Sequence, residues 1–101
     1  MKRFLLMFLL SIKLFSQNIS IPFAIEEEII TWIKFRYPSN IFSEEIIKSM
    51  YEEEIESYKW IVVYALDLEL LEQLKTVFPP QKFGYKVIKL MYETQIKEEN
   101  K

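Results

Sequence analysis

The sequence predicts an all-α protein, a small bundle of three to four helices behind an apolar N-terminal segment. Apolar residues recur every three or four positions through most of the chain, which is the period of one helix face. Glycine appears once among 101 residues, too rarely for a turn-rich sheet protein. Pro38 and Pro79-Pro80 lie between the periodic stretches, where they can end helices. We expect one helical domain over residues 17–98 and a frayed tail over 99–101.

Residues 1–16 carry the pattern of an export signal. A basic start precedes an apolar run from Phe4 to Ile12, and Ser16 offers a small residue before a cleavage point. The run is too short to cross a bilayer, which takes about 20 apolar residues. We therefore predict that residues 1–16 are a signal peptide or membrane anchor of a protein that is exported (periplasmic or extracellular) or membrane-anchored. Two alternatives are a span that extends to Ile25 and an amphipathic core helix of a soluble protein.

The first helix of the body is expected to begin near Pro22 and to stop by Tyr37, because Pro38 cannot continue it. Three glutamates, Glu26 to Glu28, follow its start, and negative charge there suits the positive end of the helix dipole. Its apolar positions have helical spacing: Ile25, Ile29, Trp32 and Ile33.

The second helical stretch starts at Ser43, a good N-cap that two glutamates follow, and Phe42 is placed to pack against Ile47. One helix from there to Pro79 would exceed the usual length of about 8–20 residues. A break near Asp67, itself a good N-cap, is therefore expected. The apolar stripe that predicts the buried face is Ile47, Tyr51, Ile55, Tyr58, Val62, Leu66, Leu70, Leu74 and Val77.

An α+β fold with strands near 59–65 and 85–92 is the alternative. The first segment is a β-branched and aromatic run, which suits a buried strand. In the second, Lys86 and Lys89 would point to opposite faces of a strand. As a helix, the same segment places Lys89 four residues before Glu93, the spacing of a helical ion pair. The helical interpretation is therefore preferred.

Composition excludes several kinds of site. Cysteine and histidine are absent, which rules out disulfides, thiolate or His-bearing metal sites and Ser-His-Asp triads. Gly84 alone cannot supply a glycine-rich phosphate loop, and Asp67 alone cannot supply an Asp-rich calcium loop. We expect no cofactor and no metal site.

Net charge bears on the choice of partner. The 13 basic and 15 acidic residues give a net charge of −2, and loss of the three basic residues in segment 1–16 would leave −5. An acidic body repels phosphate backbones, so nucleic acid is not an expected partner.

Glutamate is the only abundant catalytic residue type, with nine copies between Glu26 and Glu56, and the simplest interpretation is a solvated helix face. One resemblance gives an enzymatic alternative. It rests on Glu56-Ser57, Tyr64-Ala65 and Pro79-Pro80 followed by Tyr85-Lys86-Val87-Ile88, which resemble segments of the lytic transglycosylases, exported enzymes that cleave peptidoglycan. The resemblance implies that Glu56 is the general acid. The glycine-rich segment that usually follows in that family is missing, and the chain is shorter than a full catalytic domain.

The aromatic residues favour a different function. They make up 16% of the chain, more rings than a small domain readily buries, and Trp and Tyr dominate the binding energy of many interfaces. The sequence therefore predicts a non-enzymatic, exported or membrane-associated subunit or adaptor that binds a protein partner or a larger complex. Residues 1–16 would add a membrane contact if they are not cleaved. The residues expected to bind the partner are Trp32, Tyr37 and Trp60.

Overall fold

The computed structural model describes residues 20–100, and it is all-α as predicted. Its helices are α2 (Phe23–Arg36), α3 (Glu44–Tyr64), α4 (Leu68–Val77), α5 (Pro80–Phe83) and α6 (Tyr85–Glu99). No strand occurs in this range, so the alternative with strands near 59–65 and 85–92 is wrong. The number of helices exceeds the expected three to four because the Pro79-Pro80 connection forms a helical turn of its own. The predicted signal or anchor, 1–16, lies outside the described residues.

Two helix starts follow the predicted local chemistry. The Ser43 side chain accepts a hydrogen bond from the Ile46 backbone N–H (3.3 Å), which caps α3. The Asp67 carboxylate accepts one from the Leu70 backbone N–H (3.1 Å), which caps α4 and makes the expected break in the long apolar stretch. In both cases a side-chain oxygen satisfies a backbone donor that the helix itself leaves unpaired.

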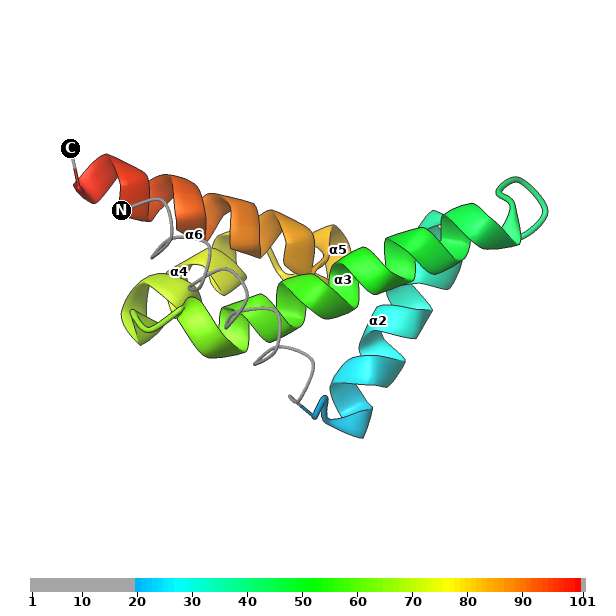
Figure 1. Ribbon diagram of the computed structural model, residues 1–101, viewed down its shortest axis with the longest axis horizontal. Helices are drawn as coiled ribbons and strands as arrows, with labels where there is room; N and C mark the ends of the chain where they lie inside the picture. Colours follow the sequence, from blue (N-terminus) through cyan, green and yellow to red (C-terminus); the bar gives the residue numbers. More distant parts are fainter. Residues whose placement is uncertain (1–19, 101) are drawn as a thin grey trace, which may run out of the picture.

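The long helix α3 organises the fold. Figure 1 shows α6 running beside the C-terminal part of α3 and beside α4, whereas α2 crosses α3 towards its N-terminal part. The short α5 lies against both α2 and α6. A hydrogen bond from the Asp67 backbone N–H to the Tyr92 hydroxyl (2.9 Å) ties the start of α4 to α6. At its end, α6 continues to Glu99, inside the segment that was expected to fray.

The core lies where α3 packs against α2 and α6, and where α6 packs against α4. Ile88 of α6 has no exposed surface, and Ile29 of α2 is almost as fully enclosed. Partly buried aromatic residues pack around this centre. The buried apolar residues are Ile29, Ile33, Ile61, Ala65, Leu71, Tyr85, Ile88 and Tyr92.

The predicted apolar stripe is only partly the buried face. Val62 in its middle is 53% exposed, and Leu66 and Val77 are exposed as well. The stripe advances by almost four residues per step, more than the 3.6 of a helix turn, so it winds away from the side that α6 covers. Ile61, the residue before Val62, is buried instead.

The Phe42 ring lies edge-on to the Tyr37 ring, with 5.2 Å between centroids.

A buried carboxylate joins α3 to the start of α6. Glu54 accepts hydrogen bonds from the backbone N–H groups of Tyr85 (2.6 Å) and Lys86 (3.3 Å), so a residue of α3 caps a helix that begins 31 positions later. Burial raises the pKa of Glu54, although the two N–H donors act in the opposite direction. The expectation that Glu54 shares a solvated face with its neighbours is wrong. Beside it, Glu53 does face solvent and pairs with the Lys86 ammonium (2.9 Å).

Candidate functional site

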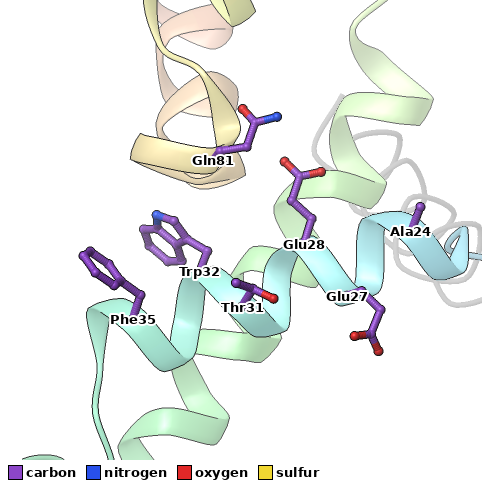
Figure 2. Close-up of a pocket in the computed structure, with 7 residues that line it drawn as sticks. All are labelled: Ala24, Glu27, Glu28, Thr31, Trp32, Phe35 and Gln81. Atoms are coloured by element: carbon purple, nitrogen blue, oxygen red, sulfur yellow. The ribbon is translucent and has the colours of Figure 1, made fainter.

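A mainly apolar groove lies along the side of α2 that faces α5. It has a volume of about 500 Å³ and lies between α2 and the α5 turn. Figure 2 shows the Trp32 and Glu28 side chains projecting from α2 towards α5, where Gln81 faces them, while Glu27 points away. The lining residues are Ala24, Glu27, Glu28, Thr31, Trp32, Phe35 and Gln81.

The two aromatic residues of the groove differ in how they are held. Trp32 packs against the core and lies edge-on to Tyr37, with 6.1 Å between ring centroids. Phe35 is 86% exposed. Folding therefore removes little of its apolar surface from water, and the ring contributes little to stability. The groove thus combines a fixed ring in its wall with a free ring at its edge.

Glu28 gives the groove its electrostatic character. One carboxylate oxygen accepts a hydrogen bond from the Tyr85 hydroxyl (3.3 Å). The other oxygen is buried and has no hydrogen-bond partner among residues 20–100. The Tyr85 ring is in turn held edge-on by Tyr58, with 5.2 Å between centroids. A carboxylate with one satisfied and one unsatisfied oxygen therefore lies at the boundary of groove and core.

This arrangement predicts a loss of stability at alkaline pH. Burial, followed by the Glu28 carboxylate, raises the pKa of Tyr85 above its ordinary value, and the same two causes raise the pKa of Tyr58. Above a pH of about 10 the unfolded chain releases these protons while the folded chain retains them, so the free energy of unfolding falls as pH rises. Urea denaturation between neutral pH and pH 11 should show this decline, and Tyr85→Phe should make it shallower. Identical pH slopes for the two proteins would contradict the assignment.

The structure brings together two of the three predicted binding residues. Trp32 and Tyr37 are in ring contact, although Tyr37 does not line the groove and also contacts Phe42. Trp60 lies elsewhere, in a hollow of about 250 Å³ between α3 and α6. Its ring packs against Tyr64 and Tyr92 at centroid distances of 5.5 and 6.0 Å, and the Lys89 ammonium lies 5.5 Å from its centroid.

Glu56, the catalytic candidate, lies on the solvent side of α3. Its side chain is 60% exposed, and its nearest ionic partner is the Lys59 ammonium at 3.8 Å. It borders a hollow of about 300 Å³ whose lining is mostly charged. General acids in glycoside cleavage are held in an apolar pocket, and the surroundings of Glu56 do not form one. The buried glutamate of this helix is Glu54, and its carboxylate already accepts hydrogen bonds from the α6 backbone.

Sequence reasoning did not single out three residues of the groove: Glu28, Phe35 and Gln81. Glu28 was grouped with its neighbours as helix-dipole charge, and Phe35 counted as one of many rings. The available signal was that Phe35 falls off the Ile25–Ile29–Ile33 face of its helix. Gln81 gave no signal, because its place depends on how α5 packs against α2.

Within residues 20–100, acidic side chains form no cluster able to hold a metal ion. None of the helices described there is both long and apolar enough to cross a membrane. No protein-family model, curated protein or solved structure matches the chain. The candidate site therefore rests on the residues and geometry described above.

Proposed function

We propose that this protein is a non-enzymatic subunit or adaptor that binds another protein through the groove on α2. The observation that carries the proposal is the exposure of the Phe35 ring beside an apolar groove of about 500 Å³. A concave apolar surface next to an exposed aromatic ring is typical of interaction sites.

The groove has the layout of a protein interface. Trp32, packed against the core, supplies a rigid wall whose order is already fixed by folding. Phe35 supplies apolar area that only a partner can remove from water. Glu28, Thr31 and Gln81 supply polar groups around it. An apolar centre with a polar rim is the usual composition of such surfaces.

The cellular location in the proposal rests on the sequence of residues 1–16. Their basic start and short apolar run favour export or membrane attachment, so the partner is expected in the same compartment. The protein would then act as an envelope or extracellular subunit.

Phe35→Ala is expected to weaken partner binding by roughly 2 kcal/mol, about 30-fold in dissociation constant, if the ring is an interface hot spot. Its stability should stay within about 0.5 kcal/mol of the wild type, because the ring is exposed. The partner is first captured from native membranes by a photo-crosslinking residue at position 35. It is then purified, and its dissociation constant is measured with each variant.

Leu66→Ala is the matched control, since Leu66 is as exposed as Phe35 but lies outside the groove. It should bind the partner like the wild type. Equal loss in both variants, or in neither, would remove the groove from the proposal. If Glu56→Gln abolishes a measurable peptidoglycan cleavage while Phe35→Ala binds normally, the enzymatic alternative replaces the adaptor.

A further inference from the structure

We propose that Glu28 makes the α2 groove selective for a cationic partner segment, one that presents a lysine or arginine beside an apolar anchor. The inference rests on the proposed function and extends it from partner binding to the chemistry of the bound segment. The apolar anchor would pack between Trp32 and Phe35, and the cation would pair with Glu28.

The first argument is the unpaired oxygen of Glu28. A buried carboxylate oxygen without a donor is unfavourable, and native proteins seldom leave one unsatisfied. Tyr85 satisfies the other oxygen, and Gln81 is the polar side chain that faces the carboxylate across the groove. Glu28 and Gln81 both line the groove, and Gln81 is exposed. A lysine or arginine entering there would supply the missing donor and a charge-assisted hydrogen bond.

The second argument is an imbalance of charge. Glu26, Glu27 and Glu28 form none of the ion pairs found in the described part of the chain. The helix dipole stabilises carboxylates within the first turn, but Glu28 is the sixth residue of α2, beyond that turn. The basic residues of α2 are Lys34 and Arg36, in its last turn. The groove therefore presents net negative charge at its Glu28 end.

The third argument is spacing. Glu28, Trp32 and Phe35 are four and then three residues apart, so they share one side of α2. Seven residues of helix rise about 10 Å from Glu28 to Phe35. The partner's cation and its apolar anchor should be separated by the same length. That corresponds to positions i and i+7 of a helix, or about three residues of extended chain.

A second copy of this chain is the competing occupant, and charge argues against it. The chain carries a net charge of −2, and its acidic residues outnumber its basic ones in the body as well. A partner of opposite charge gains from attraction where a second copy meets repulsion between the bodies.

The test selects short random peptides, displayed on phage, against the immobilised full chain. Peptides that bind the wild type are expected to be enriched in Lys or Arg next to aliphatic or aromatic residues. Selection on Glu28→Gln should keep the apolar preference and lose the basic one. This variant retains an oxygen that can accept from Tyr85. Glu69→Gln removes the same charge from an exposed position on α4 and should leave the basic preference intact.

One selected peptide then gives a quantitative result. The affinity of this peptide should be about tenfold or more lower for the Glu28→Gln protein than for the wild type. Replacing the basic residue of the peptide by Gln should weaken binding to the wild type but cause no further loss with the Glu28→Gln protein. The inference is overturned if the basic preference survives Glu28→Gln, if Glu69→Gln removes it equally, or if no peptide binds. It is also overturned if sedimentation shows a dimer that Phe35→Ala dissociates. A natural partner that depends on Phe35 but not on Glu28 would leave the proposed function standing and defeat only this extension.

Discussion

Gly84→Ala is expected to lower the free energy of unfolding by about 3 kcal/mol, from a positive backbone φ and a steric clash acting together. Gly84 has a φ of +82°, a region that residues with a Cβ atom rarely adopt. A Cβ atom at this position would lie 2.8 Å from Glu54 Oε2. The carboxylate would have to move, and the first N–H groups of α6 would lose their buried acceptor. Thermal unfolding should show the melting temperature falling by more than 10 °C, at about 4–8 °C per kcal/mol.

A double-mutant cycle separates the two causes. In a Glu54→Ala background the clash is absent, so Gly84→Ala should cost only the backbone strain of about 1–2 kcal/mol. Glu54→Ala itself should be destabilising, because it leaves two backbone donors at a buried helix start without an acceptor. If Gly84→Ala costs the same in both backgrounds, the steric part of the argument is wrong.

Ile88→Ala is expected to lower the free energy of unfolding by roughly 4 kcal/mol, near the upper part of the range for large-to-small core substitutions. Ile88 is 0% exposed and lies where α6 packs against α3. The α6 backbone is fixed at its start by Glu54, so the structure has little freedom to close the cavity. Urea denaturation gives the change directly, through the midpoint and slope.

Leu90→Ala is the matched control on the same helix. Leu90 is 56% exposed, and its truncation should change stability by about 0.5 kcal/mol or less. A similar loss for Leu90→Ala and Ile88→Ala would mean that α6 presents a different face to the core.

Features with a local cause were predictable from the sequence. The Ser43 and Asp67 caps depend on side chains that bond backbone groups three residues away, and both were recognised. The Lys89–Glu93 pair, with 3.9 Å between charged atoms, follows from helical spacing alone. Ends of helices and neighbours along a helix need no knowledge of the tertiary fold.

Features that depend on helix packing were not predictable in the same way. Ile61 and Val62 are both β-branched, adjacent and apolar, yet only Ile61 is buried. Periodicity defines a stripe but not which side of it a second helix will cover. Likewise, Glu54 is one of three consecutive glutamates, and nothing local marks it as buried. The one available hint was that Gly84 precedes a helix with no capping side chain of its own.

The candidate binding residues likewise differ in how far the sequence could predict them. The abundance of rings in the chain drew attention to Trp32, which lines the groove in the structure. The position of Trp60 far along α3, beside Tyr92, required knowing that α6 covers that part of the helix. Glu28 gains its significance from Tyr85, 57 positions away in sequence.

The Glu54 cap also has a kinetic consequence. Because α6 receives its first acceptor from α3, its N-terminal turn gains that stabilisation only after the two helices have docked. Closing this contact requires ordering about 30 intervening residues, which slows its formation relative to purely local turns. During synthesis the Glu54 carboxylate of α3 would lack these donors until Tyr85 and Lys86 have been made. In native-state hydrogen exchange, the amides of Tyr85 and Lys86 should therefore open together with the centre of α3, as a single cooperative unit.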